Sequence, residues 1–567
     1  MLNVQDKYVG YLNKVLEKID ETTIDKSKLN SLVQVIKTTE LIVPVVGGFS
    51  AGKSTLINQF LEDNILSTSI TPETALATEL RYSEMNYFEA IRKNDDMDKY
   101  DISDTEKLKE KAHEYKYVRL YLNNQKLKAI EPLILVDMPG FDAPIEHHNQ
   151  AILNYLNKGI YFIVLTSVED GNITKSMTRE ISNIMEFGKG FSFCLSKINL
   201  KPQNEVIEIK NKIKEQLEDY FDFNKDIVLT DNKSGNELEK VLKDIDVEKL
   251  FEKIFLEDLK FNYIENENSL NTIISTLKVS KEESQKVIYE LQNSVKNIII
   301  KKEKMIEEAE EKYSNTNIDG IINKVAIELN NNKETLVGYA ISNQDTFSKE
   351  INDITKNTVI REVRSRVKDI GVDIVENFSF ELKNFKNNTN SFEFDSEWIK
   401  SIGENTKNLL EKMQNGLGAI LEGRQKKDTN DKLYKIITTV LGLTTTVLTP
   451  LLEVFIVFLP EIISFFTGMS KEQKQKQQIS EKISTDVIPS IKSKLREVLP
   501  ELFNNYLKNT IELISSEFES QLEQKQKEIE LTQIEKENNI KDIEQEIAKF
   551  ENIKKELQTI TTQYLYN

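Results

Sequence analysis

The sequence predicts an α/β head with a mostly parallel sheet and a phosphate-binding P-loop, joined to an elongated all-α helical bundle with an apolar tip. Three observations support this prediction. The glycine-rich run GGFSAGKST occupies residues 47–55, between an apolar β-branched run and a helical one. Strand-like and helical segments alternate over residues 39–245. Beyond residue 245 the strand pattern fades, and apolar residues recur at helical spacing.

Composition limits the classes of protein that fit. A chain of 567 residues is long enough for two or more domains, and its 30% charged residues with only 10 prolines are typical of long solvated helices. The net charge of −18 argues against general nucleic-acid binding. A single cysteine and three histidines exclude an intrachain disulfide and argue against a cysteine or histidine metal centre. The N-terminus lacks the apolar core of a signal peptide, so we expect a cytoplasmic protein, with peripheral membrane association still open.

The pattern divides the chain into five parts. Residues 1–38 are predicted to be helical and to pack with a helical neck, and 39–245 to form the α/β domain. Residues 246–435 are expected to form the neck and trunk, 436–470 an apolar paddle or tip, and 471–567 helices that return along the trunk. The candidate strands are Leu41–Val46, Tyr117–Leu122, Leu133–Val136, Tyr161–Thr166, Phe191–Leu195 and Ile227–Thr230.

The P-loop is the strongest indication of function. Gly47, Gly52, Lys53 and Ser54 fill the pattern G-x-x-x-x-G-K-[ST] in a strand–loop–helix context. Such a loop turns backbone N–H groups toward an anion, and the helix N-terminus adds partial positive charge. We expect Lys53 to reach the outer phosphates and the Ser54 hydroxyl to ligate Mg²⁺. The residues predicted to contact the nucleotide here are Gly48, Phe49, Ser50, Ala51, Gly52, Lys53, Ser54 and Thr55.

Two further segments fit a switch-type nucleotide hydrolase. Asp137 ends the apolar run LILVD and begins D-x-x-G, so it is predicted to hold Mg²⁺ through water, and the Gly140 N–H to sense a γ-phosphate. Between the two motifs, TPETALAT offers threonines that would bond Mg²⁺ and γ-phosphate while a triphosphate is present. Thr71 is the first choice and Thr74 the second, although ordinary turn chemistry would also account for either threonine.

A base-reading segment is expected after the strand at 191–195. The sequence there is SKIN, whereas the usual guanine reader is [NT]-K-x-D, whose carboxylate accepts two guanine N–H groups. Asn199 offers one acceptor and a mismatched NH₂, so we expect weakened guanine selectivity. Lys197 is predicted to lie along the base. Asp231 and Asn232 follow the last strand and are predicted to cover the base edge, where Asp231 would supply the missing carboxylate.

The order of these motifs resembles a known family. GGFSAGKSTLIN, TPETALAT, DMPG and SKIN, followed by long helices around an apolar segment, are similar to the bacterial dynamin-like proteins of the dynamin superfamily, including their LeoA-type members. The resemblance implies a GTPase that binds GTP or GDP with Mg²⁺, assembles with itself or a related partner through its heads, and remodels membranes or releases vesicles. It assigns catalytic roles to Ser50, Lys53 and Thr71, and metal binding to Ser54, Thr71 and Asp137.

One departure from the family bears on turnover. Eukaryotic dynamins carry a glutamine at the position of Phe49, whereas bacterial relatives commonly carry a phenylalanine there. No residue in this sequence therefore evidently orients the attacking water. We therefore expect slow or partner-stimulated hydrolysis.

Residues 436–468 form an apolar segment with basic clusters on both sides. Its length would suffice for a span, but Pro450, Pro460 and two glutamates favour a hairpin that enters one leaflet of a lipid membrane. A buried hairpin packed on other helices is the alternative. The C-terminal heptads favour an intrachain bundle, in which an early helix packs on a late one, over an intermolecular coiled coil.

Two other functions remain to be weighed. An SMC-like ATPase would also combine a P-loop with coiled coils, but no LSGGQ-like motif follows residue 250. A nucleotide-binding scaffold with little turnover is the second rival, and Phe49 and Asn199 favour it.

Overall fold

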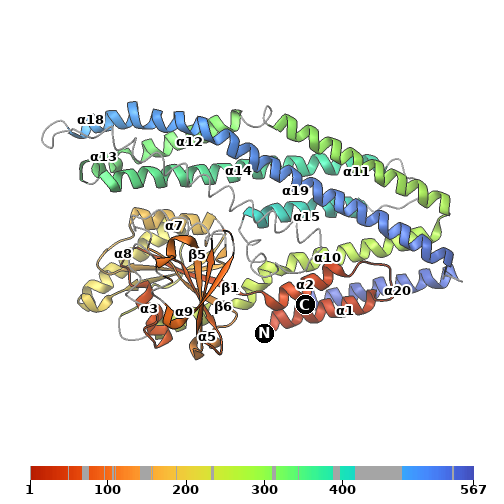
Figure 1. Ribbon diagram of the computed structural model, residues 1–567, viewed down its shortest axis with the longest axis horizontal. Coiled ribbons are helices and arrows are strands. Elements are labelled where there is room, and N and C mark those ends of the chain that lie inside the picture. The colour runs from red at the N-terminus through yellow and green to blue at the C-terminus, as the bar shows by residue number, and fades with distance from the viewer. Residues whose placement is uncertain are drawn as a thin grey trace. The chain divides into compact units, whose positions relative to one another are not determined.

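Nine strands form one mixed sheet in the described part of this computed structural model (Figure 1). Their order across the sheet is β4-β3-β5-β2-β6-β1-β7-β8-β9. The strands are β1 (Leu41–Gly47), β2 (Thr78–Tyr82), β3 (Tyr87–Arg92), β4 (Met97–Asp101), β5 (Tyr115–Leu122), β6 (Leu133–Asp137), β7 (Tyr161–Ser167), β8 (Gly190–Ser196) and β9 (Val228–Leu229). The structure describes residues 2–48, 50–66, 76–92, 94, 96–104, 108, 110–140, 155, 158–186, 188–231, 235–309, 315–342, 344–386, 396–414, 475–538 and 542–566.

Parallel pairing predominates around β1, as the sequence predicts. β1 pairs parallel with β6 and β7, and β7, β8 and β9 continue the parallel order. Every residue of β7 is buried, which explains the apolar run YFIVL with which it begins. All six predicted strands are present.

The sequence analysis missed β2, β3 and β4. Each carries two or three charged residues within five or six positions (TELRY, YFEAIR and MDKYD), and β3 pairs antiparallel with both β4 and β5. An antiparallel sheet can leave one face in water, so its strands lack the apolar run on which the prediction relied. β2 joins the two halves because it pairs parallel with β5 and antiparallel with β6.

The chain divides into two compact units, and the sheet belongs to the first, which contains residues 35–254. Its helices are α3 (Lys53–Leu61), α5 (Gln125–Ala129), α7 (Lys175–Glu186), α8 (Gln203–Phe221) and α9 (Asn236–Asp244). α3 packs against β1, β6 and α9. Gly235 permits the close approach of α9 to α3, because a Cβ there would lie 2.2 Å from the Phe60 backbone.

The second unit is helical and contains, among the described residues, those within 7–34, 255–414 and 475–566. Its long helices are α11 (Lys281–Ala309), α12 (Asn315–Asn331), α14 (Gln344–Lys386), α15 (Ser396–Gln414) and α19 (Ile488–Asn538). α11 packs along α19, and α14 packs against α12, α15 and α19. The Phe378 and Phe518 rings meet in this core with centroids 5.5 Å apart.

The last α-helix of the chain packs on α1 (Asn3–Ile19), which belongs to the helical unit from Lys7 onward. α20 (Ile543–Thr561) returns beside α1, where the Tyr11 hydroxyl lies 3.2 Å from Thr561 Oγ1 and Lys18 forms a 2.8 Å ion pair with Glu556. The predicted intrachain bundle is therefore observed. The remaining helices are α2 (Ser27–Thr38), α10 (Val247–Lys278), α13 (Lys333–Ser342) and α18 (Gln475–Lys482).

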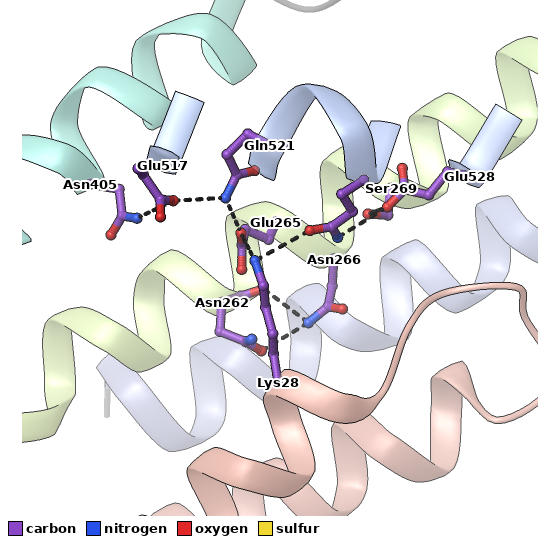
Figure 2. A network of polar contacts seen from close by, with 10 residues as sticks. Lys28, Asn262, Glu265, Asn266, Ser269, Asn405, Glu517, Gln521 and Glu528 are labelled. Atoms are coloured by element: carbon purple, nitrogen blue, oxygen red, sulfur yellow. Dashed lines mark hydrogen bonds and ion pairs between the residues drawn. The ribbon is translucent and has the colours of Figure 1, made fainter. Parts of the chain in front are cut away.

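A buried polar network crosses this unit between α10 and α19 (Figure 2). Glu265 accepts bonds from Lys28 Nζ at 3.1 Å and from Gln521 Nε2 at 2.6 Å. Gln521 and Asn405 also donate to Glu517 Oε1, at 3.0 and 3.3 Å. Farther along, Ser269 donates to Glu528.

The predicted apolar tip, 436–470, lies outside the described residues. Among the helices that the structure describes, none has the length and apolar character of a membrane span.

Candidate nucleotide-binding site

The predicted motifs meet at one edge of the sheet. β1, β6, β7 and β8 are parallel, and their carboxyl ends are in register: Val45 pairs with Asp137, Gly47 with Leu165, and Ser167 with Ser196. Ligands of open parallel sheets bind outside the carboxyl ends of the strands. The P-loop, D-x-x-G and SKIN segments are therefore brought to the expected position.

The P-loop backbone explains its glycines. Gly52 has φ +91° and precedes α3, and a Cβ on Gly47 would lie 2.1 Å from the Leu165 carbonyl oxygen. Ser50 adopts φ +60° without being glycine, and it is exposed. A left-handed conformation in this loop is the geometry that turns successive N–H groups toward one side.

Lys53 is held against the inside of this loop. Its Nζ donates to the Gly47 carbonyl at 3.1 Å and to the Gly48 carbonyl at 3.0 Å, and only 7% of the residue is exposed. The charge thus lies beneath the turn that would surround a phosphate. Lys53 begins α3, so the helix N-terminus adds to the positive potential.

Ser54 and Asp137 come together beside the lysine. The Ser54 hydroxyl donates to Asp137 Oδ2 at 2.6 Å, whereas Asp137 Oδ1 is buried without a hydrogen-bond partner. Burial raises the pKa of Asp137 above its usual value, against the opposing influence of the Ser54 bond and the Lys53 charge. A buried carboxylate with an unsatisfied oxygen is costly unless a cation or donor approaches it.

These residues fit a magnesium ion. A hydroxyl and a carboxylate supply the oxygen ligands that Mg²⁺ prefers, and the unpartnered Asp137 Oδ1 is a place for a metal-bound water. Asp137 ends β6 and Ser54 lies in the first turn of α3, so rigid elements hold both groups.

The SKIN segment contacts the P-loop directly. Ser196 Oγ donates to the Ala51 carbonyl at 2.6 Å and lies 3.0 Å from the Thr166 carbonyl. Lys197 adopts φ +57° and its Nζ donates to Glu169 at 2.8 Å. The Ile198 N–H donates to the Thr230 carbonyl at 3.3 Å, which attaches this segment to the loop that begins at Asp231.

Comparison with known proteins decides the class of this domain. The dynamin family model matches residues 43–198, a range that includes the P-loop, D-x-x-G and SKIN. Residues 43–198 form a dynamin-family GTPase domain.

Two curated relatives are similar to this chain over little more than a third of its length. A dynamin-like protein 2 of Campylobacter jejuni is 26% identical over 217 residues, which are 37% of this chain and 34% of the relative. An uncharacterised protein in the xynA 3′ region of Caldicellulosiruptor is 26% identical over 220 residues, which are 36% of this chain and 52% of the relative. The similarity thus spans about half or less of these relatives' lengths.

Solved structures of bacterial dynamins align along nearly the whole chain. One is an oligomerised dynamin pair with a mechanism for long-range sensing and tethering of membranes, at 15% identity and TM-score 0.31, covering 94% of this chain and 91% of the other. Another is the LeoA dynamin GTPase from ETEC, at 12% identity and TM-score 0.30, covering 98% and 97%. TM-scores at this level do not establish a shared fold for whole chains.

The predicted resemblance to the dynamin superfamily is confirmed, and the structure gathers many of the predicted residues of the GTPase domain. Gly140 is buried three residues beyond β6, and Thr55 lies in the first turn of α3. Asn199 is exposed in the short turn Ile198–Leu200, and Asp231 follows the last strand. Phe49, Thr71, Thr74 and Asn232 lie outside the described residues, so their roles remain predictions.

The sequence analysis missed Ser196 and Glu169. Ser196 occupies the first place of the [NT]-K-x-D pattern, and its hydroxyl bonds to the P-loop carbonyl of Ala51, so the motif itself could have identified it. Glu169 follows β7 and pairs with Lys197 across 28 residues of sequence. No local pattern indicates such a pair, because it depends on two strand ends being neighbours.

Proposed function

We propose that this chain is a dynamin-like GTPase that hydrolyses GTP to GDP and couples its nucleotide state to self-assembly and to membrane remodelling or tethering. The observation that supports the proposal best is the placement of Lys53, Ser54 and Asp137 at one sheet edge. A cation, a hydroxyl and an unsatisfied carboxylate oxygen there suit a magnesium–phosphate ligand.

Each site residue would have a separate role in nucleotide binding and hydrolysis. Lys53 offers a charged donor to phosphate oxygens, and the P-loop N–H groups surround them. Ser54 and Asp137 would hold Mg²⁺, which when bound neutralises phosphate charge. Gly140 and, outside the described residues, Thr71 would respond to the γ-phosphate. Catalysis of phosphoryl transfer is mostly positioning and charge stabilisation, so these roles account for a hydrolytic site.

We expect the base site to bind guanine, but to discriminate against other bases less strongly than the usual guanine-reading motif does. Lys197 lies at the end of β8 beside Ser196, which bonds the P-loop, so a base there would join a bound phosphate chain. Asn199 in place of the usual aspartate leaves one guanine donor mismatched. Asp231 is attached nearby through the Ile198–Thr230 bond and is the candidate for a substitute carboxylate.

The membrane and assembly roles rest on the family. A dynamin-family GTPase domain matches residues 43–198, and a bacterial dynamin pair is described as oligomerised and as tethering membranes. The apolar run at 436–468 is the segment we propose to meet lipid, and the heads are the parts we propose to meet a second copy or a related dynamin-like partner.

Nucleotide titration with the purified chain tests the central proposal. We expect binding of GTP and GDP with magnesium, and weaker binding of ATP. Lys53→Ala should weaken nucleotide binding about 10- to 100-fold, because a charged hydrogen bond contributes roughly 1.5–3 kcal/mol. The matched control is Lys214→Ala on α8, whose lysine pairs with Glu218 and Asp226 at the surface. Equal affinities for the two variants would contradict the assignment.

Hydrolysis assays distinguish a dynamin-like GTPase from the two alternative functions, a nucleotide-binding scaffold and an SMC-like ATPase. GTP turnover that rises when liposomes are added would support the dynamin-like activity. Binding without turnover under either condition would favour the nucleotide-binding scaffold, and tighter ATP than GTP would favour the SMC-like ATPase.

A further inference from the structure

Lys197, which we expect to lie along the base, is held by a carboxylate from a different strand end. Its Nζ donates to Glu169 Oε2 at 2.8 Å, and the Lys197 and Glu169 side chains are 32% and 54% exposed. The backbone of Lys197 adopts the left-handed φ of +57°. The ion pair therefore fixes the far end of a long side chain whose backbone already has a defined conformation.

Glu169 is itself built into the turn that follows β7. Its N–H donates to Ser167 Oγ at 3.1 Å, and the Ser167 hydroxyl donates to Glu169 Oε2 at 3.3 Å. The Val168 N–H donates to the Ser196 carbonyl at 3.0 Å, which continues the β7–β8 pairing beyond Ser167. Glu169 thus reaches Lys197 from the neighbouring strand end, and the two strand ends are held in fixed register.

The same strand end is attached to the P-loop. Ser196, which precedes Lys197, donates its hydroxyl to the Ala51 carbonyl at 2.6 Å. A nucleotide whose phosphates occupy the P-loop would therefore bring its base to this segment. The hydrogen bond and the charge of Lys197 hold the pKa of Glu169 below its usual value, so the carboxylate is ionised and the pair is formed at neutral pH.

We propose that Glu169 is a positioning residue that fixes the Lys197 side chain before a nucleotide binds, so that the aliphatic part of this lysine is ready to lie on the purine ring. The inference rests on the proposed function and deepens it. A flexible side chain loses rotamer freedom when a ligand orders it, and an ion pair that orders it beforehand removes part of that cost. Because the contact is with the base, the gain is the same for a diphosphate and a triphosphate.

Glu169→Gln tests this role, because it keeps the size of the side chain and removes its charge. We expect the affinities for GDP and for a non-hydrolysable GTP analogue to fall by the same factor of about two to five, the range that an exposed ion pair supports. Calorimetric titration of the full chain with each nucleotide, in the presence of magnesium, measures both affinities. The loss should be smaller at high salt, because salt screens exposed charges.

A second variant separates an effect through the lysine from a general structural effect. Lys197→Met keeps an unbranched side chain and removes the ammonium group. In the Lys197→Met chain, Glu169→Gln should cause no further loss of affinity for either nucleotide, because the partner of the carboxylate is absent.

Glu205→Gln is the matched control. Glu205 lies in the first turn of α8, is 48% exposed and forms a 3.4 Å ion pair with Lys201. The substitution removes an exposed carboxylate from the same region of the chain and leaves the Glu169–Lys197 pair in place. It should leave both affinities unchanged.

The outcomes distinguish this inference from the proposed function. A wild-type chain that binds neither nucleotide would refute both. Normal wild-type binding, with affinities that are unchanged or raised in Glu169→Gln, would refute the positioning role alone. A loss confined to the triphosphate, or an equal loss when Glu169→Gln is added to Lys197→Met, would show that the carboxylate does not act through the lysine on the base, and would also refute it.

Discussion

Glu79 in the sheet and Glu517 in the helical unit are both buried carboxylates, with exposed fractions of 1% and 0%, yet their surroundings differ in charge. Glu79 meets Arg81 and Arg119 directly. Glu517 accepts neutral amide donors from Gln521 and Asn405, and its Oε2 is buried without a hydrogen-bond partner. Burial therefore raises the pKa of Glu517, and the nearby Lys28 charge does not offset it.

The difference shows that one residue type serves two purposes. Around Glu79 the charges are matched, so the carboxylate fixes a geometry, and its removal takes away the most buried partner of Arg81 and Arg119. Around Glu517 the charge is poorly matched, so the carboxylate gains little from being ionised. The interactions of Glu79 thus depend on a fixed charge, whereas the surroundings of Glu517 suit a neutral group at the same depth.

Truncating Glu79 should produce the largest effect. Glu79→Ala is expected to lower the free energy of unfolding of the sheet unit by about 3 kcal/mol, the lower end of the cost of breaking a buried ion pair, because among the described carboxylates Arg81 keeps only Glu40 and Arg119 only the more distant Glu89 as partners. Calorimetry of the full chain measures the loss. Glu89→Ala on β3 is the control, since Glu89 lies 3.8 Å from Arg119 and is more exposed, and it should cost about 1 kcal/mol or less.

Tryptophan fluorescence identifies the unit that unfolds. Trp398 is the only tryptophan and lies in α15 of the helical unit. The fluorescence-detected transition of Glu79→Ala should match that of wild type. A shift of this transition as large as the calorimetric loss would contradict a locally confined effect.

The pH dependence of stability should have opposite signs at the two carboxylates. The pKa of Glu79 is below its unfolded value of 4.5, so its stabilising contribution is present above pH 4.5 and is lost as pH falls below it. The pKa of Glu517 is raised above 4.5, so its contribution is greatest at low pH and is lost as pH rises past that value. Urea unfolding of wild type against Glu79→Gln and Glu517→Gln, from about pH 2.5 to 7, covers the range below 4.5 for Glu79 and above 4.5 for Glu517 and measures both differences. If the wild-type-minus-variant difference in unfolding free energy changed with pH in the same direction for both carboxylates, the predicted contrast between them would be wrong.

The sequence predicted the nucleotide edge because that chemistry is local. The P-loop is contiguous, and Asp137 is recognisable because it ends an apolar run, so Lys53, Ser54 and Asp137 needed no tertiary information. The buried strands β1, β6, β7 and β8 were predicted for the same reason, since each is a short apolar run.

Features that depend on tertiary neighbours were missed. β2–β4 each carry two or three charged residues in five or six positions, so their sequences resemble those of polar loops until their partner strands are known. Glu79 is polar in sequence, and nothing near it indicates that Tyr155, 76 residues away, covers it. The Glu169–Lys197 pair and the α10–α19 polar network likewise join residues that only the fold makes neighbours.

Neutralising Glu517 should produce the smallest effect. Glu517→Gln keeps an oxygen for the amide donors of Gln521 and Asn405 and removes a charge whose second oxygen has no hydrogen-bond partner. We expect the stability of the helical unit to change by about 1 kcal/mol or less at pH 7, with a gain favoured, because replacing poorly paired buried charges is often neutral or stabilising. Urea unfolding followed by Trp398 fluorescence measures the change.

Glu530→Gln is the control in the same helix, where a partly exposed carboxylate accepts Gln526 Nε2 at 2.7 Å. It should change stability by a few tenths of a kcal/mol. A loss of about 3 kcal/mol or more in Glu517→Gln, comparable to the loss at Glu79, would mean that an ionised Glu517 is fully compensated by a cation such as Lys28. The two buried carboxylates would then be equivalent, and the helical unit would depend on a fixed charge in the same way as the GTPase domain.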